Sequence, residues 1–293
     1  MAYTNYSVDS AFIEAYKANV IQLAQQTFAK IRPHVSEEAG TGEAFNHERL
    51  AATDAIEKTA QRHPTDLIDD VWDRRVTTPR TFTHALTIEH EDKVQMLADP
   101  ESAYTTNQAM AMARQYDDLI IEAATGDALD GDGTPVVFPA GQVVGDGLSP
   151  ISFDMMTAVQ EKFLSNEIDM DIPKICLVGP TQVRKLLQLT EQTSADYVST
   201  QALQKLSAYG IVPNWMGFTW IMTNRLLIPA VGELSCLAFT SKALSLVINQ
   251  DIFTRVGERA DLSYMIQIFS QFTAGCSRII DEEIVHIHVA DTL

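Results

Sequence analysis

The sequence is poor in cysteine and contains no long apolar run. Its three cysteines are odd in number, and each lies in an apolar or strand-like stretch: Cys176, Cys236 and Cys276. This argues against a disulfide scaffold and favours a reducing compartment. The first ten residues lack a basic start and an apolar centre, so we expect no signal peptide. The longest apolar runs, such as LLIPAV, are too short to cross a bilayer, and we expect a soluble intracellular protein without membrane contact.

Positive charge is also scarce. The 21 Lys and Arg residues stand against 39 Asp and Glu residues, which gives a net charge of −18. No segment is basic enough to wrap phosphates, and this disfavours a protein that binds DNA through its average surface charge. An acidic surface instead favours solubility and repulsion from other polyanions.

The common catalytic motifs are missing as well. The sequence has no G-x-S-x-G elbow, no G-x-x-x-x-G-K-[ST] phosphate loop, no G-x-G-x-x-G after a strand and no H-E-x-x-H helix. Adjacent acids such as Asp117 and Asp118 are common on surfaces and do not by themselves imply acid–base chemistry. We therefore predict that no residue is catalytic and that no cofactor is bound.

Two features resemble metal sites only superficially. If Asp127 were the first position of an EF-hand loop, the sixth would be Asp132 and the twelfth Phe138, where that loop needs Gly and Glu. A turn-rich surface loop is the main interpretation of 127–132, with calcium binding as a minor alternative. His286 and His288 share one face of a predicted strand, but further ligands are missing nearby. We predict no metal-binding residue.

The 293 residues are 46% hydrophobic and 20% charged, which is typical of a folded globular protein. This length exceeds the usual size of one domain, so we expect two lobes or one elaborated domain. Residues 9–31 predict an amphipathic helix whose apolar stripe includes Phe12 and Tyr16. The helix would either pack on its own domain or dock on a neighbouring subunit as an arm, and the sequence favours neither.

A projecting ribbon is predicted at residues 60–96. Strand formers occupy 76–78 and 81–88, Pro79 interrupts them, and too little of the segment is apolar to bury both faces. A two-stranded ribbon of this kind needs a partner surface. Its charged residues are either a solvated face or intersubunit ion pairs that set register. The candidate intersubunit residues are Asp70, Asp73, Arg74, Arg75 and Arg80, and Asp69 lies beside them.

The clearest predicted element is a helix over residues 100–125. Asp99 is a suitable N-cap, Pro100 suits the first helical position, and Gly126 suits the end. We expect Met112, Tyr116, Leu119, Ile120 and Ala123 on one face and Gln108, Gln115, Asp118 and Glu122 opposite.

The second half of the chain predicts a mixed α/β lobe. A Gly- and Asp-rich loop or loose hairpin covers 126–150, followed by a helix from Ser152 to about Asn166. A buried strand is predicted at 174–179, helices from Pro180 and at 200–208, and two strands around a turn at 210–224. From residue 234 onward the chain is mostly strand.

Three segments in this order resemble the major capsid proteins of tailed double-stranded DNA phages, the Hong Kong 97 type. Residues 98–126 are similar to the spine helix, with an A-R-x-x-D-x-x-I-x-x-A-A-x-G pattern. Residues 209–226 resemble a G-I-V…G-F element that precedes a strand and T-N. Residues 237–289 resemble the closing strands, including a G-x-x-R turn from Gly275 to Arg278.

The resemblance implies an α+β Hong Kong 97-like fold. It implies an N-terminal arm at 1–59, an extended β-ribbon loop at 60–96 over an adjacent subunit, a peripheral domain with the spine helix at 97–129 and 246–293, and an α/β axial domain at 130–245. The intersubunit residues would be Asp70, Asp73, Arg74, Arg75 and Arg80 of the ribbon, with Phe12 and Tyr16 of the arm.

The resemblance also implies function and partners. Subunits would assemble as pentamers and hexamers into an icosahedral shell that encloses DNA without sequence-specific binding. Partners would be further copies, a scaffolding protein, a portal and a decoration protein, and the virion capsid would assemble in the host cytoplasm. The ribbon's lysines, Lys58 and Lys93, lie at its base, which argues against isopeptide cross-linking, and the short arm argues for a separate scaffolding protein without N-terminal cleavage. The alternatives are an encapsulin-like cargo compartment and an acidic cytosolic α/β enzyme.

Overall fold

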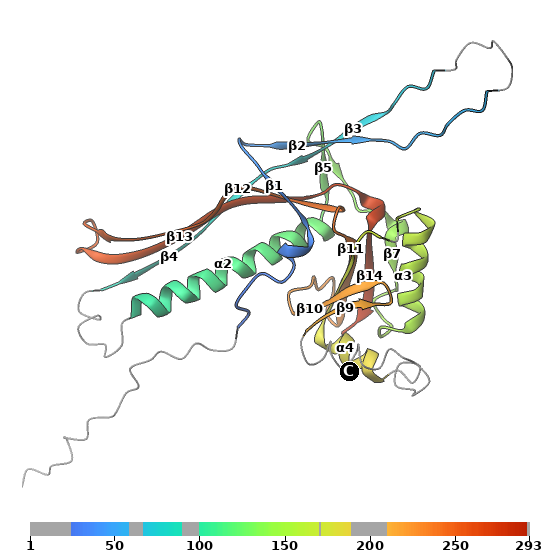
Figure 1. Ribbon diagram of the computed structural model, residues 1–293. Coiled ribbons are helices and arrows are strands. Elements are labelled where there is room, and N and C mark those ends of the chain that lie inside the picture. The colour runs from blue at the N-terminus through green and yellow to red at the C-terminus, as the bar shows by residue number, and fades with distance from the viewer. Residues whose placement is uncertain (1–24, 59–66, 90–99, 170, 189–209, 292–293) are drawn as a thin grey trace, which may run out of the picture.

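The computed structural model describes residues 25–58, 67–89, 100–169, 171–188 and 210–291. They form three sheets and three α-helices (Figure 1). The first sheet has the order β1 (Ser36–Ala39), β12 (Leu244–Arg259), β13 (Met265–Arg278) and β4 (Arg80–Ile88). The second has the order β7 (Val143–Val144), β14 (Ile284–Ala290), β11 (Glu233–Thr240), β8 (Lys174–Val178), β10 (Phe218–Met222) and β9 (Ile211–Trp215). The third has the order β2 (Phe45–Leu50), β3 (Trp72–Thr77), β5 (Ala128–Asp130) and β6 (Pro135–Val136).

The long helix α2 (Pro100–Thr125) packs along the first sheet, and its predicted bounds are confirmed. It ends where the Gly126 N–H donates to the Glu122 carbonyl, and Asp99 lies outside the described residues. Four residues of the predicted apolar face are buried, Met112, Tyr116, Leu119 and Ile120, while Ala123 is partly exposed. The Tyr116 ring stacks on Phe272 of β13 at 4.2 Å between centroids. The polar face was predicted less well, because Gln108 is fully buried and bonds to β13.

The first sheet and α2 form one lobe of the subunit, and the second sheet forms the core of the other lobe. All five residues of β8 are buried because β11 and β10 flank it, as the sequence predicted. Helix α3 (Phe153–Ser165) begins at Ser152, whose side chain accepts from the Met155 N–H, and α4 (Pro180–Gln188) follows β8. Both helices are confirmed, and the helix predicted at 200–208 lies outside the described residues.

The strand pairing predicted inside residues 60–96 is wrong. β3 pairs with β2 in an antiparallel hairpin, whereas β4 pairs with β13 in a different sheet. Figure 1 shows the described parts of this hairpin, residues 45–58 and 67–77, projecting away from both lobes. The sequence missed β2 because four of the six residues of FNHERL are polar or charged, so neighbouring strand formers at 76–88 were paired with each other instead. The break at Thr78 and Pro79 carries the chain from one sheet to the next.

Gly275 lies inside β13 and not in a turn, which corrects the interpretation of the G-x-x-R pattern. Its Cα lies against the crossing chain: a Cβ there would be 2.8 Å from Cγ2 of Thr77 and 3.0 Å from Cα of Pro79. Glycine is needed because only a residue without a side chain admits this approach. The glycine therefore marks the place where the hairpin leaves the body.

The N-terminal prediction is only partly tested. Residues 25–31, the end of the predicted helix, have no helical structure, and a short 3-10 turn, η2 (Arg32–His34), follows them. The rest of that prediction, with Phe12 and Tyr16, lies outside the described residues. The remaining short elements are η3 (Ala140–Gln142) and η4 (Asp281–Glu283). Among the described residues, no helix is both long and apolar enough to span a membrane.

Candidate functional site

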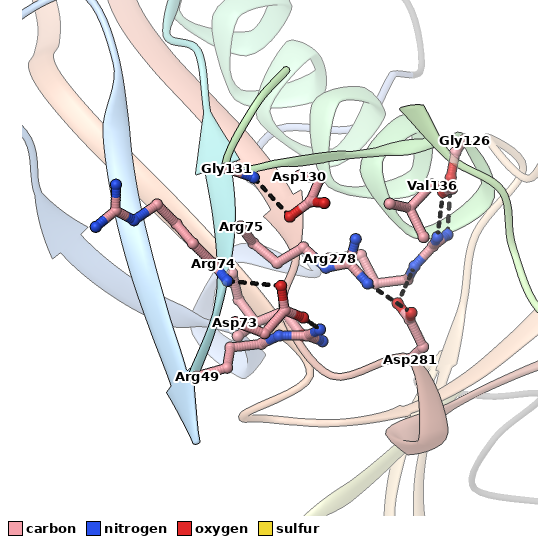
Figure 2. Close-up of polar contacts among 11 residues, drawn as sticks. Arg49, Asp73, Arg74, Arg75, Gly126, Asp130, Gly131, Val136, Arg278 and Asp281 are labelled. Carbon is pink, nitrogen blue, oxygen red and sulfur yellow. Dashed lines mark hydrogen bonds and ion pairs between the residues drawn. The ribbon is translucent and has the colours of Figure 1, made fainter. Parts of the chain in front are cut away.

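A buried cluster of charged side chains holds the base of the hairpin (Figure 2). Asp281 of η4 accepts from Arg278 Nε at 2.6 Å and from Arg75 Nη2 at 2.9 Å. Arg278 is fully buried and donates its other two nitrogens to the carbonyls of Gly126, at 2.8 Å, and Val136, at 2.9 Å. The guanidinium groups therefore join β3, β13, η4, the end of α2 and β6 at one point.

The chemistry of this cluster explains why these residue types are present. A buried charge is stable only when it is paired and hydrogen-bonded, and the planar guanidinium of Arg278 satisfies one carboxylate and two carbonyls at once. Its plane also lies over the Phe138 ring, 5.0 Å from the centroid. Removing one partner would leave an uncompensated charge, so each member depends on the others.

A second ion pair extends the cluster along the hairpin. Arg49 of β2 contacts the Asp73 carboxylate of β3 and donates Nη1 to the Ile279 carbonyl at 2.7 Å. The other Asp73 oxygen accepts from the Arg74 N–H at 2.7 Å (Figure 2). Burial lowers the pKa of Arg49, and the nearby Arg75 charge lowers it further. Arg49 thus ties the outer strand of the hairpin to the chain that follows β13.

The structure separates the candidate residues that the sequence grouped together. Arg75 is only 4% exposed and paired with Asp281 of the same chain, so it has an intrachain role in place of the predicted intersubunit one. Arg74 pairs with Glu48 at 2.6 Å and Arg80 with Glu122 at 2.6 Å, all on the surface. Asp69 and Asp70 are exposed on the hairpin.

Sequence reasoning missed Arg49, Arg278 and Asp281. One signal was available for Arg278: the buried residues of β13 are even-numbered from Ile268 to Ala274, and Arg278 continues that parity. No local signal identified Asp281, because its partner Arg75 is 206 residues away in the chain.

The outer part of the hairpin carries large apolar side chains that its own subunit leaves exposed. Leu67 is 90% exposed and Trp72 is 66% exposed. The exposed apolar residues of the hairpin are Leu50, Ile56, Leu67, Ile68, Val71 and Trp72. Several large exposed apolar side chains on one projecting element are typical of a protein–protein contact.

Of the two histidines, His286 is buried in the interior and His288 is partly exposed. The His286 ring stacks on Phe138 with 3.6 Å between centroids, and its Nε2 lies 3.0 Å from the Ala124 carbonyl. Burial lowers the pKa of His286 to about 4, so the ring is neutral at pH 7. In the described ranges no group of three or more His, Cys, Asp or Glu side chains is arranged to hold a metal.

The fold resembles subunits of solved phage capsids. A chain from Mycobacterium phage Che8 is 17% identical, with a TM-score of 0.71 and 98% of each chain covered. The capsid of Ralstonia phage GP4 matches at 8% identity and a TM-score of 0.75, covering 100% of this chain and 99% of that one. The capsid of cyanophage P-SCSP1u matches at 14% identity and a TM-score of 0.73, covering 99% and 96%. This likeness confirms the predicted Hong Kong 97-like α+β fold.

Sequence comparison gives the family. None of the curated protein sequences matches this chain significantly. The profile of the family described as phage capsid protein matches residues 8–291. Neither the cargo-compartment nor the enzyme alternative is favoured by these matches. The chain therefore belongs to the phage capsid protein family and is a structural subunit that self-assembles into the shell of the virion.

Proposed function

We propose that this capsid protein assembles as pentamers and hexamers into an icosahedral shell around double-stranded DNA. In this proposal the hairpin of each subunit lies over a neighbouring one. The exposed apolar side chains of the hairpin carry the proposal, because an isolated two-stranded hairpin needs a partner surface for stability. The likeness to solved capsid chains supports the same arrangement.

The contact is strong enough to matter when it is repeated. Burying one large apolar side chain contributes about 1.5–3 kcal/mol, and Leu67 and Trp72 are both mostly exposed before assembly. Each subunit in a shell would make this contact once and receive it once. Modest contacts of this kind add up in a closed assembly through multivalency.

The charged residues of the hairpin would set register rather than affinity. Asp70 and Arg74 of the hairpin are exposed, as is Arg80 at the start of β4, and surface ion pairs contribute only about 0–1 kcal/mol each. Asp73 and Arg75 are bound within their own chain and shape the hairpin base instead. Phe12 and Tyr16 are the proposed intersubunit contacts of the N-terminal arm.

Organisation and partners complete the proposal. The arm would precede the hairpin of β2 and β3, and α2 with the first sheet would form the peripheral domain. The axial domain would be residues 130–245 together with β14 (Ile284–Ala290), which belongs to the six-stranded sheet and not, as the sequence suggested, to the peripheral domain. A scaffolding protein, a portal and a decoration protein are the proposed partners, and assembly would occur in the host cytoplasm. The net charge of −18 favours a wall that encloses DNA without sequence-specific binding, because an acidic surface repels the phosphate backbone. Counterions screen this repulsion over about 10 Å.

The test is electron microscopy of the full chain carrying Leu67→Ser and Trp72→Ser, expressed with its scaffolding partner. We expect no closed shells, together with an unchanged circular dichroism spectrum, because both side chains are exposed in the subunit. Leu164→Ser, at an exposed leucine of α3, is the matched control and should leave shells intact. Normal shells from the double variant would overturn the proposed role of the hairpin.

A further inference from the structure

The segment that joins the N-terminal region to the body has no backbone structure of its own. Residues 25–31, here called the strap, belong to neither a helix nor a sheet. Side chains of α2 hold them: Asn107 accepts from Gln25 Nε2 at 2.9 Å, and Arg114 donates to the Gln25 side chain at 2.7 Å. Side chains of α2 therefore help to set the position of the strap.

Asp117 is the main attachment point. Its carboxylate is fully buried in the middle of α2 and accepts from the backbone N–H groups of Lys30 and Ile31, both at 3.0 Å. It also accepts from the side-chain amide of Gln26. A buried carboxylate is costly unless it is fully hydrogen-bonded, so these donors and the carboxylate hold each other in place. No sequence pattern indicates this role, because an adjacent Asp pair is typical of a surface.

The next residue of α2 holds the other lobe. Asp118 binds the guanidinium of Arg225 through both carboxylate oxygens, and Arg225 lies in the loop between β10 and β11. This pair is about one-third exposed, with side-chain exposures of 34% and 30%. Bidentate geometry of this kind fixes orientation as well as distance. Neighbouring residues of one helix thus bind two segments that are far apart in the sequence.

Lys30 connects these two segments directly. Its backbone N–H donates to Asp117, while its side-chain Nζ donates to the Met222 carbonyl at the end of β10, at 3.0 Å. Together with the backbone, these contacts close a ring. Hydrogen bonds join Asp117 to Lys30, Lys30 to Met222 and Arg225 to Asp118, and the chain itself joins Met222 to Arg225 and Asp117 to Asp118. The two positions are also linked electrostatically, because the hydrogen bond to Asp118 and the negative charge of Asp117 both raise the pKa of Arg225.

We propose that Asp117 and Asp118 form a junction that couples the strap to the lobe built on the six-stranded sheet. Displacing the strap from α2 then loosens the β10–β11 loop, and moving that loop loosens the strap. Coupling between two binding events is reciprocal by thermodynamic necessity, so both directions must show it. The inference goes beyond the proposed shell function, because it concerns one subunit and holds before any assembly. In a shell, it would let whatever engages the N-terminal region influence the axial lobe.

Hydrogen exchange of the unassembled full chain tests the junction. Arg225→Gln removes the ion pair to Asp118 without touching the strap. We expect the amides of Lys30 and Ile31 to exchange on the order of tenfold faster, as for loss of one charged hydrogen bond. Lys30→Met removes only the Nζ donor, and it should speed exchange at both the strap and residues 222–225.

The control is Lys162→Met. Lys162 also donates its Nζ to a backbone carbonyl, that of Gly141, but away from the junction. This variant should leave exchange at 25–31 and 222–225 unchanged. In the double variant Lys30→Met, Arg225→Gln, the acceleration should be clearly smaller than the product of the two single effects, because both break the same ring.

Two results would overturn the coupling. One is exchange of Lys30 and Ile31 that stays within twofold of the wild-type rate in Arg225→Gln. The other is a double variant whose acceleration equals the product of the single effects. Because these measurements use unassembled protein, they are independent of whether shells form, so failure here and failure of the proposed shell function are distinguishable.

Discussion

Replacing Asp281 by Asn tests the buried cluster at the base of the hairpin. The Asp281 side chain is 10% exposed and accepts from Arg278 at 2.6 Å and from Arg75 at 2.9 Å. An Asn side chain has one acceptor oxygen, and its amide group points donors at the second guanidinium. Arg278 keeps its two carbonyl acceptors, so Arg75 suffers the larger loss.

The expected magnitude follows from burial. A hydrogen bond to a charged group contributes about 1.5–3 kcal/mol, and breaking a buried ion pair from one side costs about 3–5 kcal/mol, because a charge remains unpaired. Both arginines are at least 95% removed from solvent, at 4% and 0% side-chain exposure, so water cannot replace the lost carboxylate without opening the cluster. We expect Asp281→Asn to lower the free energy of unfolding by about 3–5 kcal/mol.

The assay is urea unfolding of the unassembled subunit, followed by circular dichroism. Glu282→Gln is the matched control, since this neighbouring acid is exposed and the change should alter stability by about 0.5 kcal/mol or less. Hydrogen exchange at β2 and β3 should also rise in Asp281→Asn, because the hairpin loses its anchor. A loss below about 1 kcal/mol, the range of a surface pair, would refute the reasoning.

Three further predictions use the same unfolding assay. Gly275→Ala should destabilise the subunit by about 1–3 kcal/mol, because the new Cβ would lie 2.8 Å from Thr77; unchanged stability would disprove the close crossing. Ser152→Ala should cost about 1 kcal/mol through loss of the bond from the Met155 N–H, and no loss would contradict the cap. Burial lowers the pKa of His286 from 6.5 to about 4, so the unfolded chain takes up this proton first, and stability is lost as pH falls through that window. In the His286→Gln variant, the fall in the free energy of unfolding at low pH should be smaller by up to about 3 kcal/mol. Plots of unfolding free energy against pH that run parallel for the variant and the wild type would count against this role of His286.

Local signals in the sequence were enough for several elements. The bounds of α2 follow from a proline at its start, a glycine after its end and an apolar period between them, all of which act within a few residues. The turn between β9 and β10 is equally local, since Met216 and Gly217 both have positive φ, as a two-residue hairpin requires. The family resemblance rested on the order of such segments.

Strand pairing was not local. The strand formers of β3 and β4 adjoin in the sequence, and a nearby pairing costs least in loop entropy, so the sequence alone favoured a ribbon between them. The structure pairs β3 with the weakly marked β2 and sends β4 to β13. The chain can pass from β3 to β4 because Gly275 of β13 leaves room for the crossing. Gly275 is far from residues 60–96 in the sequence, so no pattern within that segment predicts the crossing.

What the sequence by itself determined is the main helices α2, α3 and α4, most of the later strands, the acidic character and the family. Only the tertiary structure decided which charged residues are buried. Arg75 and Asp281 are 206 residues apart, and Asp117 and Ile31 are 86 apart, yet both pairs are in contact. An aspartate or arginine in a sequence looks the same whether water or a buried partner stabilises its charge, and only packing supplies that partner.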